Sequence, residues 1–165
     1  VYPPETSWMR LPESRLPGLV LCDAKGRRGK VAFLPADLDR CYARDNMPDH
    51  GALLNNLIRR LADDRIPLSV SGKGFVYTQL YRQNDRLILH LVNLNNPDAW
   101  RTFLHELIPI GPLQIGVQLP EGKHCQSVSL CVAGIEVKPT SESEGCVKFE
   151  VPQIEDHEMI VIELS

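Results

Sequence analysis

The sequence lacks an apolar run long enough to cross a membrane, and it also lacks a dense basic cluster. A membrane-spanning helix needs about 20 apolar residues, and no stretch approaches that length. The 18 Lys and Arg residues are scattered among 21 Asp and Glu residues, giving a formal net charge of −3. Basic residues gather only in KGRRGK (25–30), whose two glycines between apolar runs predict a hairpin turn. We therefore expect neither a membrane nor a nucleic acid as a partner.

Motifs for metal or nucleophile chemistry are missing as well. The five cysteines form no CxxC pair and no Cys/His cluster with zinc spacing, and there is no Gly-x-Ser-x-Gly motif. We therefore expect no metal and no cofactor. An odd number of cysteines without motif spacing favours the cytoplasm, although the compartment stays open. Cys22, Cys131 and Cys146 lie in strand-like runs and are expected to be small buried hydrophobes.

The chain opens with Val-Tyr-Pro-Pro-Glu, without an initiator Met and without the apolar core of a secretory signal. We therefore expect it to be a segment of a longer protein. Its 165 residues suit one domain or two small ones. With 43% hydrophobic and 24% charged residues, its composition is that of a globular protein rather than a disordered one.

Residues 1–68 have the pattern of a small α/β segment with two strands and one helix. Apolar runs at Leu16–Cys22 and Lys30–Leu34 have the right length for buried strands. A helix is predicted over Asp49–Ala62, where apolar residues recur at steps of three and four. Asp49, or alternatively Asn46, is expected to cap its start. Because these elements cannot cover both faces of a sheet, the segment is either the tail of a larger domain or packs on the rest of the chain.

Residues 69–165 have the alternating pattern of strands. The predicted strands are Phe75–Arg82, Leu87–Val92, Leu113–Leu119, Val128–Val132, Val147–Val151 and Met159–Leu164. Several short strands separated by Gly, Pro and Asn turns predict a sandwich or barrel, and we favour an antiparallel β-sandwich. Leu87–Val92 is apolar on both faces and is expected to be central. The junction between the two halves is expected within Pro67–Gly74.

One candidate site is the polar stretch that follows the second predicted strand. Its candidate residues are Asp37, Asp39, Arg40, Arg44 and His50. Ligands of α/β sheets bind beyond the carboxyl ends of strands, which is where this stretch lies. His50 has the chemistry of a general base, with Cys41 as a nearby thiol. The simpler interpretation is a polar loop with an internal Asp–Arg pair and aspartates that cap the helix.

A second candidate is an aromatic platform for sugar rings. The aromatic residues considered for exposure are Trp8, Tyr77, Tyr81 and Trp100. Trp100, in a polar loop after Asn95-Asn96-Pro97-Asp98, is the best of these, although packing over the edge of the sandwich is the favoured interpretation. Among the other polar groups, His90 is expected to be a core or cross-strand histidine. His157 is expected at a loop or strand edge, and Glu158 in a solvated turn.

Six segments together resemble a known arrangement. They are YPPE (2–5), GKVAFLPADLDR (29–40), DHGALLNNLIR (49–59), LILHLVNL (87–94), IPIGP (108–112) and VPQIEDHE (151–158). In combination they resemble the C-terminal part of bacterial glycoside hydrolases of the beta-galactosidase-like or alpha-L-fucosidase-like type. The resemblance implies that residues 1–68 are the end of a flavodoxin-like, class I amidotransferase-like domain, often called the beta-galactosidase trimerisation domain. Residues 69–165 would then be the terminal β-sandwich.

In that family a catalytic TIM barrel precedes both parts, so none of its catalytic carboxylates has a counterpart in this chain. We therefore expect a non-catalytic accessory fragment with an architectural or oligomerisation role. Its partners would be further copies of itself or the missing catalytic barrel. The alternative is a carbohydrate-binding β-sandwich, which needs a row of exposed aromatic residues on one face. A third hypothesis, a hydrolase in its own right, has no complete set of catalytic residues to support it.

Overall fold

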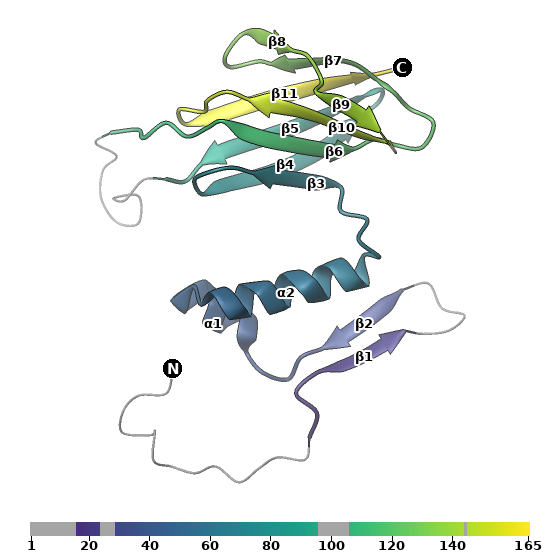
Figure 1. The fold of residues 1–165 in the computed structure, drawn as a ribbon, viewed down its shortest axis with the longest axis vertical. Helices are drawn as coiled ribbons and strands as arrows, with labels where there is room; N and C mark the ends of the chain where they lie inside the picture. Colours follow the sequence, from purple (N-terminus) through teal and green to yellow (C-terminus); the bar gives the residue numbers. More distant parts are fainter. Residues whose placement is uncertain (1–15, 24–28, 96–105, 144) are drawn as a thin grey trace. The chain divides into compact units, whose positions relative to one another are not determined.

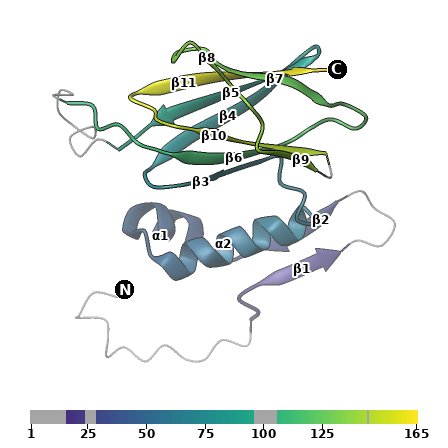
Figure 2. The ribbon, with the colours of Figure 1, turned by 45° about the horizontal axis from the view of Figure 1, so that its top comes forward.

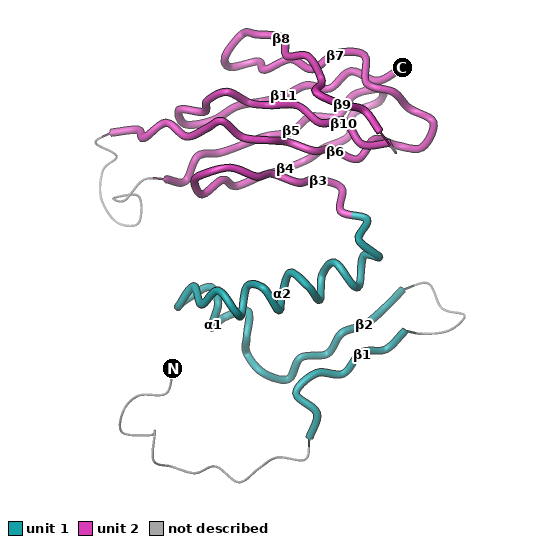
Figure 3. Tube along the Cα trace, viewed as in Figure 1, with its two compact units in different colours: residues 1–65 teal, residues 66–165 magenta. Residues whose placement is uncertain are grey.

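The computed structural model describes residues 16–23, 29–95, 106–143 and 145–165. The chain forms two compact units, residues 1–65 and residues 66–165 (Figure 3). Trp8, Trp100 and most of the predicted hairpin turn lie outside the described residues. The segment expected to be a junction is partly a strand, because β3 (Leu68–Ser71) pairs within a sheet of the second unit.

The first unit begins with a β-hairpin. Strands β1 (Val20–Asp23) and β2 (Lys30–Phe33) pair antiparallel (Figure 1). The prediction that these strands are buried is wrong, since Val31 and Phe33 are each 61% exposed. Among the described residues these two strands are the whole sheet, so nothing pairs with their outer edges. Cys22 of β1 is exposed as well, contrary to the expectation that it is buried.

The helix predicted from the apolar period is present as α2 (Pro48–Leu61). Its N-cap is Met47, so both predicted caps, Asp49 and Asn46, are wrong. Pro48 occupies the first helical position, where the N–H that proline lacks would have no partner anyway. Of the helices in the described ranges, none is both long and apolar enough to cross a membrane.

A second helix, α1 (Leu38–Asp45), was not predicted and occupies part of the polar stretch. None of its residues is buried, and its apolar residues Leu38, Cys41 and Tyr42 form only a short stripe over about two turns. Asn46 ends the helix in the left-handed conformation, and its N–H donates to the carbonyl of Tyr42 at 2.8 Å. The ring of Tyr42 lies so close to Gly51 of α2 that a Cβ there would sit 2.7 Å from it. Helix α1 therefore packs tightly on α2 despite its polarity.

The described part of the first unit has no buried side chain. Its large exposed hydrophobic residues are Leu16, Val20, Leu21, Val31, Phe33, Tyr42, Leu53 and Ile58. A unit that folds alone normally buries such side chains, each contributing roughly 1.5–3 kcal/mol. Among its own described residues the first unit is therefore a partial core with exposed apolar surface.

The second unit is an antiparallel β-sandwich, which confirms the predicted fold class (Figures 1 and 2). One sheet has the order β3-β6-β10-β9 and the other the order β4-β5-β11-β7-β8. The strands after β3 are β4 (Val76–Gln83), β5 (Arg86–Asn93), β6 (Leu113–Gln118), β7 (Cys125–Leu130), β8 (Ile135–Val137), β9 (Ser141–Ser143), β10 (Cys146–Val151) and β11 (His157–Leu164). The six predicted strands are present, whereas β3, β8 and β9 were not predicted.

Alternate side chains of the two sheets meet in one core. Its largest fully buried members include Leu89 and Leu91 of β5, Phe149 of β10, and Ile160 of β11. Strand β5 lies between β4 and β11, as its apolar pattern predicted. Only one face of β5 is buried, however, because Ile88 on the other face is half-buried. The sandwich therefore presents an outer face with partly accessible side chains.

The turn between β7 and β8 is held by a buried carboxylate. Glu158 is only 2% exposed, and its oxygens accept the N–H groups of Val132 at 2.7 Å, Ala133 at 3.0 Å and Met159 at 2.9 Å. The expectation that Glu158 lies in a solvated turn is therefore wrong. Its position in β11 directs it toward the interior, where these three donors replace water. Cys131, at the start of the same turn, is exposed rather than buried.

Candidate functional site

The outer face of the five-stranded sheet gathers aromatic and imidazole side chains. Alternation along β4, β5 and β11 places every second residue on this face, opposite the core, and five of these residues carry aromatic, imidazole or amide groups. We call them the tyrosine–histidine face: Tyr77, Gln79, Tyr81, His90 and His157. Their core-side neighbours Leu89, Leu91 and Ile160 are fully buried, which fixes the register of the three strands.

Three of these rings form a diagonal across the sheet. His90 pairs in register with Gln79 on one side and Met159 on the other, so Tyr81 and His157 are its diagonal neighbours. The rings of His90 and His157 stack with centroids 5.4 Å apart and an interplanar angle of 14°. The Tyr81 ring meets His90 edge-on, with centroids 5.9 Å apart at 80°. Such diagonal contacts lie within the reach of aromatic side chains across neighbouring strands.

The two tyrosines are open to solvent. Tyr77 is 51% exposed and Tyr81 is 54% exposed, and both lie on the edge strand β4. The amide of Gln79 donates to the phenolic oxygen of Tyr77, which fixes the position of that ring. Half-buried apolar residues such as Ile88 and Val92 lie beside them on β5. The face therefore combines exposed rings with neutral hydrogen-bonding groups.

Sequence reasoning missed this face as a unit. It treated His90 as a core or cross-strand residue and His157 as a strand-edge residue with no partner. His157 is the first residue of β11, and its ring nitrogen lies 3.1 Å from that of His90. The available signal was the alternation in each strand, which puts both histidines opposite buried leucine and isoleucine. The missing information was that β5 and β11, far apart in sequence, are neighbours.

The polar stretch predicted as a candidate site lies in the first unit. Asp37 precedes α1 and pairs with Arg40 one helical turn later. Arg44 makes two hydrogen bonds of 2.8 Å to the carboxylate of its neighbour Asp45. These hydrogen bonds and the charge of Arg44 hold the pKa of Asp45 below its usual value, and the same bonds with the charge of Asp45 raise the pKa of Arg44. The predicted arginines are therefore each paired with a nearby aspartate.

The remaining members of this predicted set do not complete a catalytic arrangement among the described residues. Asp39 lies in the first turn of α1, where a negative charge favours the helix N-terminus. His50 lies in the first turns of α2, and its Nδ1 is buried without a hydrogen-bond partner in the described structure. The geometry thus brings Asp37 to Arg40, but it gives no contact that links His50 to either of them.

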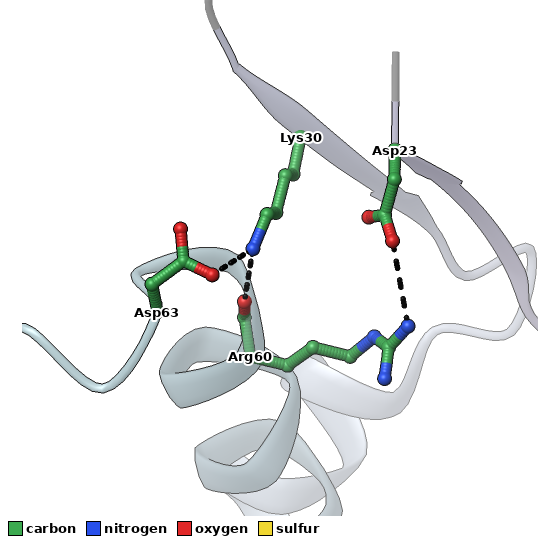
Figure 4. Close-up of polar contacts among 4 residues, drawn as sticks. All are labelled: Asp23, Lys30, Arg60 and Asp63. Atoms are coloured by element: carbon green, nitrogen blue, oxygen red, sulfur yellow. Dashed lines mark hydrogen bonds and ion pairs between the residues drawn. The ribbon is translucent and has the colours of Figure 1, made fainter. Parts of the chain in front are cut away.

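A separate set of charges joins the hairpin to the end of α2. Lys30 of β2 contacts the Asp63 carboxylate, and its ammonium lies 3.4 Å from the carbonyl oxygen of Arg60 (Figure 4). The Arg60 guanidinium lies 3.6 Å from the carboxylate of Asp23 on β1. These groups are exposed, so we interpret them as contacts that orient the hairpin rather than as a site.

A shallow depression of about 270 Å³ lies beside the start of β11. It is lined by Val132, Ala133 and residues 153–158. The Glu158 carboxylate in its wall is already occupied by backbone donors. Across the part of the chain that the structure describes, no group of three His, Cys, Asp or Glu side chains could hold a metal ion.

The fold is similar to part of a solved structure, the alpha-L-fucosidase isoenzyme 2 from Paenibacillus thiaminolyticus. The TM-score is 0.70 and the sequence identity is 25%, over 90% of this chain and 22% of the fucosidase chain. A cycloisomaltooligosaccharide glucanotransferase from Paenibacillus sp. matches with a TM-score of 0.48 and 18% identity, over 58% of this chain and 16% of that one. No protein-family model matches the sequence, and no curated protein does.

This chain is thus similar, over most of its length, to a small portion of a glycoside hydrolase. The similarity to a fucosidase supports the resemblance drawn from the sequence at that coarser level. The assignment of residues 1–68 to a beta-galactosidase trimerisation domain remains a prediction.

Proposed function

We propose that this chain is a non-catalytic accessory part of a carbohydrate-active glycoside hydrolase. In this proposal residues 1–68 complete an amidotransferase-like domain of the parent protein, and residues 69–165 form its accessory sandwich. The role of the first part is to bury apolar surface against a further copy of the chain or against the catalytic barrel.

One observation carries this proposal. The first unit has no buried side chain among its described residues, and the apolar side chains of Val31 and Phe33 in its hairpin are each 61% exposed. An exposed apolar hairpin with unpaired edges is a surface that association normally covers. The sandwich of the same chain has a complete core, so the incompleteness is confined to one unit. The chain also matches only 22% of the fucosidase chain, which is consistent with an accessory portion.

Sedimentation velocity on the full chain over a concentration series tests the packing role. We expect concentration-dependent association together with binding of an apolar-surface dye. The double variant Val31→Thr/Phe33→Thr should weaken both, because it removes apolar surface from the hairpin without touching the sandwich core. Val132→Thr is the matched control, since Val132 is 59% exposed on a turn of the sandwich. A monodisperse monomer at high concentration that binds no dye would sink the proposal.

A further inference from the structure

We infer that the tyrosine–histidine face of the sandwich binds a neutral oligosaccharide across Tyr77 and Tyr81. The inference rests on the carbohydrate class given in the proposed function, but it does not depend on the packing role of the first unit. It assigns the platform to strand β4 instead of Trp100, which lies outside the described residues.

The spacing of the two rings fits an extended ligand. Tyr77 and Tyr81 are four residues apart on one strand, so their Cα atoms are separated by about 14 Å at ~3.4 Å per residue. Side chains of a strand stand roughly perpendicular to the sheet, which presents both rings on the same face. Each ring is about half exposed, so each has free surface for contact. A single sugar ring is too small to reach both positions, whereas an oligosaccharide can.

The chemistry between the rings also matches a sugar. A sugar ring has an apolar C–H face, which can stack on an aromatic ring, and a rim of hydroxyl groups that need donors and acceptors. Tyrosine supplies an apolar body and a polar tip in one side chain. Beside the rings, the Gln79 amide keeps its carbonyl oxygen and one N–H for a ligand, and the ring nitrogen of His90 that does not contact His157 adds one donor or acceptor. Apolar surface with a few placed polar groups is the general composition of small-molecule sites.

The charge of the face favours a neutral ligand. Besides its two histidines, the acidic and basic positions of this face on β4, β5 and β11 are Arg86 and Glu163, which lie 3.7 Å apart and offset one another. An acidic or basic polymer would find no excess of opposite charge here. Tyrosine is also enriched at protein interfaces, so the dependence of the ring signals on protein concentration tests that alternative. The balanced charge of the face favours a neutral carbohydrate over a charged polymer.

The test is a titration of the isotope-labelled full chain, followed by NMR of the aromatic rings. The probes are 2′-fucosyllactose, a neutral trisaccharide that contains fucose, and the fucose-free trisaccharides maltotriose and cellotriose. We expect at least one trisaccharide to shift the ring signals of Tyr77 and Tyr81 in a saturable way. Tyr81→Ala and Tyr77→Ala should each weaken that binding about tenfold. Tyr42→Ala, which removes an exposed tyrosine of the first unit, should leave the affinity unchanged.

Three outcomes would overturn the inference. The first is that none of the three trisaccharides shifts these rings in the unmodified chain, a result that needs no variant to fold. The second is binding that Tyr77→Ala and Tyr81→Ala leave unchanged. The third is a shift of the same rings with protein concentration alone, which would identify the face as a protein interface. An unmodified chain that stays monomeric in sedimentation would count against the packing role without affecting this titration, so the two failures are distinguishable.

Discussion

Nδ1 of His90 lies 3.1 Å from Nε2 of His157, although 67 residues separate the two histidines in the sequence. The antiparallel pairing of β5 with β11 brings them together, and their rings stack. A hydrogen bond between two imidazoles needs one N–H donor and one unprotonated acceptor. At least one of the two rings is therefore neutral while this contact exists.

We expect long-range ¹H–¹⁵N spectra of the full chain at neutral pH to show one of these two nitrogens protonated and the other not. His157→Leu should change the tautomer balance of His90 and cost about 1 kcal/mol of stability through the lost hydrogen bond. His124 serves as the control, because its Nδ1 contacts the Glu142 carboxylate at 3.0 Å and should be unaffected by that substitution. Two facing nitrogens in the same protonation state would contradict the contact.

Removing the buried carboxylate of Glu158 should destabilise the fold far more than removing the carboxylate of Glu163 on the same strand. Glu158→Ala leaves the N–H groups of Val132 and Ala133 without their acceptor, so we expect a loss of about 2–3 kcal/mol. Glu163→Ala is the matched control, because the Glu163 side chain is 39% exposed on the outer face and pairs with Arg86 at 3.7 Å; it should cost less than about 1 kcal/mol. Urea unfolding of each variant measures the difference, and equal losses would show that the turn does not depend on Glu158.

A glycine in the second unit holds a close approach between two backbone segments. Gly111 has a φ of 141°, and a Cβ there would collide with the carbonyl oxygen of Pro152 and lie 3.0 Å from the Cα of Gln153. Both the strained conformation and the collision oppose alanine, so Gly111→Ala should cost about 3 kcal/mol or more.

The control separates strain from collision. Gly134 also has a positive φ, 68°, but a Cβ there would meet nothing within 4 Å. Gly134→Ala should therefore cost only about 1 kcal/mol, the penalty of the left-handed conformation itself. If thermal unfolding gave the two variants the same loss, the close approach at Gly111 would not contribute to stability.

The contact between Lys30 and Asp63 should make the first unit sensitive to acid. The hydrogen bond and charge of Lys30 hold the pKa of Asp63 below its usual value. A carboxylate with a lowered folded-state pKa stabilises the fold above its unfolded pKa, which is about 3.9 for aspartate. That contribution is lost as the pH falls through the lower folded-state pKa.

Titration of the Asp63 carboxyl carbon by NMR measures this effect directly. Lys30→Gln should move the pKa of Asp63 up toward its usual value, because the main cause of the shift is gone. Asp63→Asn should remove this part of the acid sensitivity of amide exchange at the end of α2. Asparagine tolerates the left-handed conformation of this residue, which has a φ of 52°. An Asp63 titration that Lys30→Gln leaves unchanged would refute the assignment.

Much of the sandwich could be predicted because its strands carry a period of two. In β6, for example, Leu113, Ile115 and Val117 are buried while Gln114 is exposed. The strands that were missed, β3, β8 and β9, have three or four residues and are too short to display that period. Helix α1 was missed for a related reason, since its 8 residues make only about two turns, too few to establish a helical period.

The contacts of the candidate sites could likewise be predicted only where they join residues close in the sequence. The pairing of Asp37 with Arg40 joins residues three apart, and the sequence suggested it as an internal Asp–Arg pair. The contact between His90 and His157 depends on which distant strand lies beside β5, and no local pattern carries that information. The burial of Glu158 likewise depends on the turn at Val132 folding back over it.

By itself the sequence determined the longer strands, the main helix and the sandwich class, because hydrophobic period and turn residues act over a few positions. Tertiary structure alone decided which faces are covered. It left Val31 and Phe33 exposed although their run is apolar, and it buried Glu158 although its residue type is polar. The physical reason is that burial depends on partners supplied by distant segments, so an apolar strand stays exposed wherever no second layer packs on it.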